Sequence, residues 1–325
     1  MFLRTSKNLK YLCVDKIICN QIIFENLCKN NTITSIDFLC NFNFKAINLL
    51  AKFLYKNCTL ISLDLSGRRW SSINSIGSKG AKVLADALCK NTTLTFLDIS
   101  YNNLGSEGGK ALAGALYKNT TLTSLDISSN DLESEGGKAL ANALYKNSTL
   151  TFLDISFNYI GSDGGKTLAN ALCKNTTLTS LYLRDNDFEA EVGIAIANAL
   201  RKNTTLTSLD LSGDWSSDNN IGSEGGKALA DALCKNTTLT FLDISENNLG
   251  SEGGKAMADA LCKNITLTSL NISDNNIASE GGKALADALC KNNTLTSLKL
   301  RGNNFEADVL ADVLCKNNTL KHLDI

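Results

Sequence analysis

The sequence predicts an α/β solenoid: a right-handed stack shaped like a horseshoe, with parallel strands inside and α-helices outside. Three observations predict it. The chain consists mostly of near-copies of one stretch, residues 94–121, repeated about every 28 residues. The first half of each copy alternates apolar and polar residues, as a strand does, whereas the second half has apolar residues at helical spacing. A fixed period of this length indicates that neighbouring copies stack to bury a shared core.

The copies can be aligned on the leucine or isoleucine that precedes each predicted strand. Their spacing is 28 residues through most of the chain, 34 after Leu60, 33 after Leu206 and 25 after Leu295. The aligned positions are Leu9, Ile33, Leu60, Leu94, Leu122, Leu150, Leu178, Leu206, Leu239, Leu267, Leu295 and Leu320. We expect an irregular N-terminal segment with a degenerate first repeat over 1–32. An array of about ten units, the last one incomplete, then covers 33–325.

The first half of the unit predicts a short strand and a turn. Leu97 and Ile99 alternate with Asp98 and Ser100, so one face is buried and the other is wet. Asn102 follows, and its amide can bond turn backbone that the interior would otherwise leave unpaired. The same asparagine recurs as Asn130, Asn158, Asn186, Asn247, Asn275 and Asn303, with Asn74 and Asn219 after two insertions. We interpret this column as structural.

The second half of the unit predicts a helix. Ser106 is the expected N-cap, Glu107 lies in the first turn and Lys118 lies near the negative C-terminal end. The predicted apolar stripe comprises Ala111, Leu112, Ala115 and Leu116. Gly108 and Gly109 weaken helix propensity, so their recurrence predicts a close backbone approach between neighbouring units.

The motif Leu-x-x-Leu-x-Ile-x-x-Asn-x-Leu over residues 94–104 matches a leucine-rich repeat. Units of 28 residues that combine this motif with a full helix resemble the ribonuclease-inhibitor-like subfamily of leucine-rich repeats, over roughly residues 30–325. That subfamily includes ribonuclease inhibitors, the sensor regions of NOD-like receptors and GTPase-activating proteins for Ran. The resemblance implies a horseshoe that binds proteins, and it transfers no functional residue to this chain.

A longer period lies on top of the first. Segments 66–78 and 212–223 are similar insertions, SGRRWSSINSIGS and SGDWSSDNNIGS, and the segments at 183–191 and 300–308 share a Phe-Glu-Ala sequence. We infer a block duplication. Trp70 and Trp215 are then either inherited copies or binding residues on surface loops.

Composition excludes several classes of function. The formal net charge of -1 gives no global field to recruit nucleic acid or an anionic membrane, although local patches remain open. No run of about 18 apolar residues predicts a membrane span, and the N-terminus lacks a secretory signal. Six of the eleven cysteines share one position in the repeat, too far apart across packed helices to form bridges. We therefore expect a soluble, cytoplasmic protein with reduced thiols.

Catalytic chemistry is not indicated. His322 is the only histidine and lies in the last predicted strand, so we interpret it as a surface residue. The GGKT sequence at 164–167 lacks the first glycine of a phosphate-binding loop, and similar GGKA segments recur in most units. The cysteines lack the CxxC spacing and histidine partners of a zinc site. We predict no catalytic residue, no cofactor and no metal.

The predicted inner surface carries two rows of side chains. The first is an aspartate row, Asp37, Asp64, Asp98, Asp126, Asp154, Asp210, Asp243 and Asp324, interrupted by Tyr182, Asn271 and Lys299. These aspartates are either a consensus of the repeat whose mutual repulsion water reduces, or they attract a basic partner by complementary charge. Phe96, Phe152 and Phe241 form the second row, alternating with serines. Exposed aromatic side chains of this kind are candidate binding hot spots.

Departures from the repeat consensus are the sharper indications of function. Tyr182, Arg184, Asp185, Lys299 and Arg301 replace the usual residues on or just after their strands. Tyrosine, tryptophan and arginine dominate interface energetics. The predicted partner-binding residues are Trp70, Phe96, Asp98, Asp126, Phe152, Asp154, Tyr182, Arg184, Trp215, Phe241, Asp243 and Arg301.

The leading functional hypothesis is a non-enzymatic scaffold that binds a protein partner of unknown identity on its concave face. We expect it to bind neither nucleic acid nor a membrane. The alternatives are a regulator of an enzyme, either an inhibitor of a basic target or a GTPase activator, and the ligand-sensing region of a receptor or microbial effector. Because the sequence stops inside a predicted strand, we also expect either a longer product or end-to-end self-association.

Overall fold

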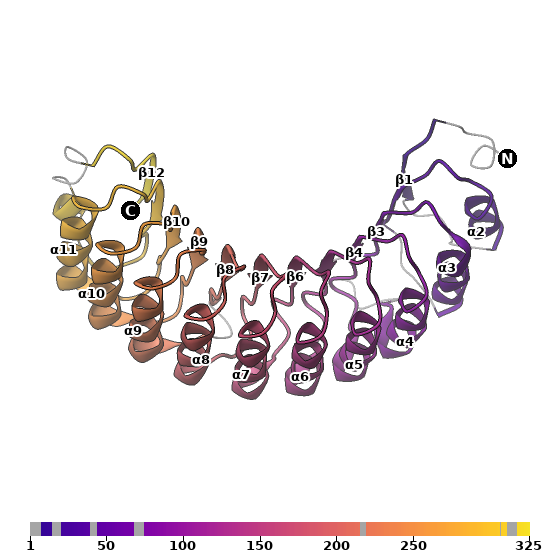
Figure 1. Ribbon diagram of the computed structural model, residues 1–325, viewed down its shortest axis with the longest axis horizontal. Helices are drawn as coiled ribbons and strands as arrows, with labels where there is room; N and C mark the ends of the chain where they lie inside the picture. Colours follow the sequence, from indigo (N-terminus) through magenta and orange to yellow (C-terminus); the bar gives the residue numbers. More distant parts are fainter. Residues whose placement is uncertain are drawn as a thin grey trace. The chain divides into compact units, whose positions relative to one another are not determined.

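A computed structural model describes residues 8–14, 21–39, 44–67, 75–214, 219–305, 307–310 and 317–325 of the chain. The chain divides into two compact units, Met1–Asn158 (unit 1) and Tyr159–Ile325 (unit 2). Each unit repeats a strand and a helix, and Figure 1 shows that the helices of a unit lie in one row and its strands in another.

Unit 1 contains strands that follow one another in the sheet in the order of the sequence. Its elements are β1 (Tyr11–Val14), α2 (Gln21–Leu27), β2 (Ser35–Phe38), α3 (Phe44–Lys56), β3 (Ser62–Asp64), α4 (Gly77–Leu88), β4 (Phe96–Asp98), α5 (Gly105–Leu116), β5 (Ser124–Asp126), α6 (Glu133–Leu144) and β6 (Phe152–Asp154).

Unit 2 has the same alternation. Its elements are α7 (Gly161–Leu172), β7 (Ser180–Tyr182), α8 (Ala190–Leu200), β8 (Ser208–Asp210), α9 (Gly222–Leu233), β9 (Phe241–Asp243), α10 (Gly250–Leu261), β10 (Ser269–Asn271), α11 (Ala278–Leu289), β11 (Ser297–Lys299), the 3-10 helix η1 (Ala307–Leu310) and β12 (His322–Asp324).

The strands pair in parallel and in the predicted register. In unit 1, Leu97 of β4 is opposite Leu125 of β5, and Asp98 is opposite Asp126. Ile99 lies just beyond β4, yet its N–H still donates to the carbonyl of Asp126 at 2.9 Å. From β3 to β11 the central leucine consequently points into the core, while the residues on either side of it share the opposite face.

The core of each copy lies between its strand and its helix. Leu94, Leu97, Ile99 and Leu104 are completely buried, as are their equivalents in the other well-formed copies. On α5 the buried stripe contains Leu112, Ala113, Ala115 and Leu116, whereas Ala111 is only half-buried. The predicted stripe is thus wrong by one residue, because the helix turns Ala113 rather than Ala111 towards the core.

The asparagine column has the structural role predicted for it. Asn130 is completely buried, and its Nδ2 donates to the carbonyls of Ile99, Ile127 and Ser128 at 3.0, 3.0 and 3.1 Å. Its Oδ1 accepts from the N–H of Asn102 at 2.9 Å. Each side chain therefore satisfies backbone groups of its own turn and of the neighbouring copy, which water cannot reach. Asn219 repeats the pattern, and Asn74 lies outside the described residues.

The predicted N-cap is wrong. Helix α5 begins at Gly105, so Ser106 lies inside the first turn, and the residue before the helix, Leu104, makes no side-chain cap. The N–H of Gly105 instead donates to the carbonyl of Asn130 in the next copy, at 2.9 Å. Glu107 does lie in the first turn, as predicted, and Lys118 follows the last helical residue by two positions.

The paired glycines allow adjacent helices to approach. A Cβ atom on Gly109 would lie 3.2 Å from the Cα of Gly136 on α6 and 3.0 Å from Cδ2 of Leu132. A larger residue at this position would push α5 and α6 apart. The predicted close backbone approach is confirmed.

Candidate partner-binding surface

The outward side chains of β3 to β6 form two rows in unit 1. In one row Phe96 pairs with Ser124, which pairs with Phe152, so two half-buried rings lie on either side of a serine. Because strands repeat about every 4.8 Å, the two phenylalanines lie on strands roughly 10 Å apart. We call the outward residues Ser62, Asp64, Phe96, Asp98, Ser124, Asp126, Phe152 and Asp154 the unit-1 strand face.

The second row of this face contains the aspartates. Oδ1 of Asp98 accepts from the N–H and the hydroxyl of Ser100 at 2.9 and 2.7 Å, and Asp126 accepts from Ser128 in the same way. These aspartates thus close a turn within their own copies, a structural role that the sequence did not indicate. Within the described residues, Oδ2 of Asp98 and Oδ2 of Asp126 accept no hydrogen bond.

The electrostatics of the row follow from its packing. Burial, and then the neighbouring carboxylate of Asp126, raise the pKa of Asp98 from 3.8 to about 6, although hydrogen bonds from Ser100 oppose the shift. The pKa of Asp126 is raised by burial and by Asp154. Stacked carboxylates that water reaches poorly resist ionisation. A cation placed against this row would relieve the repulsion.

The strand face of unit 2 is more varied. Tyr182 on β7 is opposite Asp210, which is opposite Asp243 on β9. Asn271 on β10 donates from Nδ2 to Oδ2 of Asp243 at 2.7 Å. In this copy a neutral amide therefore stands where other copies have a carboxylate. Phe241 is half-buried between two serines. Arg301 is exposed just after β11.

Arg184 brings a positive charge to the acidic residues of unit 2. Burial, and then Asp243, raise the pKa of Asp210, while the charge of Arg184 lowers it. Burial and Asp274 likewise raise the pKa of Glu246, again against Arg184. This half-buried arginine therefore lies among carboxylates.

The predicted binding residues fall into three groups. The unit-1 strand face contains Phe96, Asp98, Asp126, Phe152 and Asp154. The strand face of unit 2, or the turn just after it, contains Tyr182, Arg184, Phe241, Asp243 and Arg301. Trp70 and Trp215 lie outside the described residues.

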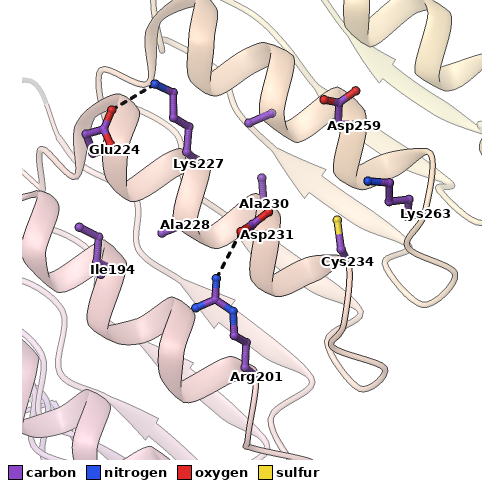
Figure 2. Close-up of a pocket in the computed structure, with 11 residues that line it drawn as sticks. Ile194, Arg201, Glu224, Lys227, Ala228, Ala230, Asp231, Cys234, Asp259 and Lys263 are labelled. Atoms are coloured by element: carbon purple, nitrogen blue, oxygen red, sulfur yellow. Dashed lines mark hydrogen bonds and ion pairs between the residues drawn. The ribbon is translucent and has the colours of Figure 1, made fainter.

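The helix side carries grooves that the sequence did not indicate. Figure 2 shows one of about 490 Å³ on α8, α9 and α10 of unit 2. Its charged side chains are largely paired: Lys227 contacts Glu224 at 3.1 Å, and Arg201 contacts Asp231 at 3.7 Å. A groove of about 480 Å³ lies between α4 and α5 of unit 1. Small residues on adjacent helices, such as Ala85 and Gly114, are the feature of the sequence that could have predicted this groove.

The residues considered for metal, thiol and phosphate chemistry lie as follows in the described part of the chain. No group of three or more histidine, cysteine or carboxylate side chains there could hold a metal ion. The eight cysteines in that part are all free, and His322 is exposed on β12. Gly164 to Thr167 lie inside α7, where Lys166 pairs with Glu191 at 2.9 Å.

The strand-and-helix units and their buried asparagines indicate a leucine-rich repeat, and the family model described as Leucine Rich repeat matches the chain. It matches residues 90–113, 118–141, 146–169, 174–197, 202–214, 217–230, 235–258, 263–286 and 291–308, together more than half of the chain. The chain belongs to the leucine-rich-repeat family. Proteins of this family are generally protein-interaction scaffolds, and their fold is typically non-enzymatic.

Two solved structures with TM-scores above 0.5 have the same fold. The leucine-rich-repeat protein LegL7 from Legionella pneumophila is 22% identical with a TM-score of 0.51, over 96% of this chain and 88% of that one. An internalin, inlF, from Listeria monocytogenes is 18% identical with a TM-score of 0.53, over 92% and 75%. Actin-binding site 2 of leiomodin-1 is 26% identical over 40% of this chain and 78% of that one, with a TM-score of 0.35. No curated protein matches the chain.

None of the helices in the described part of the chain is long and apolar enough to cross a bilayer.

Proposed function

We propose that this leucine-rich-repeat protein is a non-enzymatic scaffold that binds a protein partner through its strand faces, and that the unit-1 strand face recognises a basic side chain. The observation that supports this most strongly is the arrangement around β5. Phe96 and Phe152 lie on either side of Ser124, and Asp126 follows Ser124 on the same face of the same strand. Aromatic rings beside a carboxylate suit the stem and the charge of lysine or arginine.

The charges of this face support the same partner. The described residues of β3 to β6 include no lysine or arginine, whereas each of these strands ends in an aspartate. Since packing raises the pKa of Asp98 and of Asp126, an arriving cation both screens the repulsion and gains a poorly solvated carboxylate. Association should therefore slow as ionic strength rises.

A matched set of variants tests the face. Serine occupies the positions equivalent to Phe96 and Phe152 in other copies, so Phe96→Ser with Phe152→Ser preserves the repeat pattern. In affinity capture from the native cell, we expect this double variant to lose the partner by about tenfold or more, as for removal of two aromatic hot spots. Phe241→Ser makes the same change in unit 2 and shows whether that face contributes.

Retention of every wild-type partner by the double variant would contradict binding at the unit-1 strand face. Alanine at Tyr182 and Arg184 tests the strand face of unit 2 in the same assay. Unchanged binding there would remove unit 2 from the proposal.

The aspartate row also supports a second candidate, an inhibitor that covers a basic target enzyme. Capture of an enzyme whose activity falls on adding the purified protein would favour this reading over a scaffold. We further propose membership of the ribonuclease-inhibitor-like subfamily, because the units are 28 residues long with full helices. A cytoplasmic location is proposed from the free cysteines.

A further inference from the structure

The carboxylates of unit 1 have two kinds of surroundings. On the helix side, Lys110 and Lys82 donate to the exposed Glu107 at 3.1 and 3.3 Å, and these hydrogen bonds lower the pKa of Glu107. On the strand side, each of β3 to β6 ends in an aspartate, and the described residues of these strands include no lysine, arginine or histidine. An acid held by cations keeps its charge in mildly acidic solution, whereas an acid packed among other acids loses it first.

Asp98 lies between two other aspartates of the unit-1 strand face. The parallel register places Asp64 of β3 on one side of it and Asp126 of β5 on the other, each about one strand spacing of 4.8 Å away. The turn after β4 contributes Ser100 and Tyr101, neither of which is a cation. Burial, and then the charge of Asp126, raise the pKa of Asp98 to about 6. This side chain therefore takes up a proton between neutral and mildly acidic pH.

Asp98 can take up this proton without losing its turn. Oδ1 accepts from both the N–H and the hydroxyl of Ser100, at 2.9 and 2.7 Å, whereas Oδ2 accepts no hydrogen bond within the described residues. The proton is consequently expected on Oδ2. Asn271 shows that a neutral side chain holds the same turn, because its Oδ1 accepts from the N–H of Ser273 at 3.1 Å. Protonation thus changes the charge of the face and leaves its turns in place.

We propose that the unit-1 strand face is a pH switch: it holds the basic side chain of its partner at neutral pH and releases it in mildly acidic solution. The inference rests on the proposed recognition of a basic side chain by this face. A bound ammonium group stabilises the ionised carboxylates, so the complex takes up protons at lower pH than the free face does. By linkage, the affinity is fully present while the free face is ionised and is lost as the free face takes up protons.

The raised pKa determines the pH range and the size of the effect. An ordinary exposed aspartate is still ionised at pH 5, so its contribution to binding hardly changes between pH 7.5 and pH 5. For Asp98, with a pKa of about 6 in the free face, protonation at pH 5 should weaken the binding of a cation about tenfold. Burial and Asp154 also raise the pKa of Asp126, which adds to the loss.

The test measures binding of a fluorescent oligo-L-lysine peptide to the full chain at pH 7.5 and pH 5.0, at one ionic strength. Lysine keeps its charge at both pH values. Wild type should bind about tenfold more weakly at pH 5.0. The strand-face variant Asp98→Asn with Asp126→Asn should bind weakly at pH 7.5 and change less than about twofold at pH 5.0. The control variant Asp259→Asn with Asp287→Asn removes the same charge from exposed helix positions and should keep the pH dependence of the wild type.

The results separate the pH switch from the proposed function. Binding that the strand-face variant loses at pH 7.5, but that wild type retains in full at pH 5.0, would overturn the switch and leave the recognition of a basic side chain standing. Equal binding by wild type and the strand-face variant at pH 7.5, or no binding by wild type, would overturn both. Far-UV circular dichroism accompanies each measurement, and loss of the folded signal of wild type at pH 5.0 would assign the release to unfolding and overturn the switch.

Discussion

Asp98 uses one carboxylate oxygen for the structure of its own copy and presents the other on the strand face. Oδ1 of Asp98 closes the turn by accepting from Ser100, while Oδ2 remains available on the strand face. Asn271 shows which part the fold needs, because its Oδ1 accepts from the N–H of Ser273 at 3.1 Å in the same way. The negative charge is therefore not required for the turn.

Asp98→Asn should stabilise the protein at neutral pH. The pKa of Asp98 is raised from 3.8 to about 6 in the folded state, so its contribution to stability is fully present below about pH 4 and is lost as pH rises through 6. Asparagine keeps the acceptor and removes this loss. We expect a gain of about 1–2 kcal/mol in the free energy of unfolding at pH 7, allowing for solvent screening, and little change at pH 4.

Urea unfolding at the two pH values measures this difference. Asp259→Asn on α10, an exposed helix position, is the control and should show no such pH dependence. A loss of stability in Asp98→Asn at pH 7 would contradict the role given to the charge.

Glu133 occupies a backbone conformation that suits glycine. Its φ is 55°, whereas Gly105, Gly161, Gly222 and Gly250 occupy this position in other copies with φ of 60–64°. Glu133→Gly should raise the free energy of unfolding by about 1 kcal/mol, because the left-handed region is costly for residues with a Cβ. Glu135→Gly, two residues further into α6, should lower it by about 1 kcal/mol. Thermal or urea unfolding of both variants checks the opposite signs.

At the scale of the element, the buried asparagine joins the strand and turn of one copy to those of the next. Asn130→Asp keeps the size of the side chain but removes the donor to the carbonyls of Ile99, Ile127 and Ser128. It also buries a charge. We expect a loss of about 3 kcal/mol or more in the free energy of unfolding.

The exposed neighbour provides the comparison for this variant. Asn103→Asp makes the same chemical change one residue later and should cost less than about 0.5 kcal/mol. Similar urea midpoints for the two variants would show that the column is not the structural element described here.

Elements were predictable where local pattern and burial agree. Leucine and asparagine recur at the positions of Leu97 and Asn102 from copy to copy, and both side chains are buried as that recurrence predicts. The N-cap was not predictable, because the left-handed backbone at Asn103 and Gly105 moves the helix start before Ser106. The role of Asp98 in the turn was not predictable either. It depends on a hydrogen bond from Ser100, and the strand pattern says only that both residues point outward.

Within each unit as a whole, the surfaces divide by charge. In unit 1 the strands β3 to β6 each end in an aspartate and contain no lysine or arginine, so a net charge of -1 conceals an acidic patch. Sequence columns identified the acidic row, because its members recur.

Hydroxyl-radical footprinting of the protein with its captured partner tests binding at the unit-1 strand face most directly. Phe96 and Phe152 are half-buried and oxidisable. Tyr117 and Tyr145, which follow α5 and α6 and are exposed, report on the helix side of unit 1 in the same experiment. We predict that the partner lowers oxidation of Phe96 and Phe152 severalfold while an exposed helix residue of unit 2, Ile194, is unchanged. Unaltered oxidation of both phenylalanines in the saturated complex would contradict binding at the strand face.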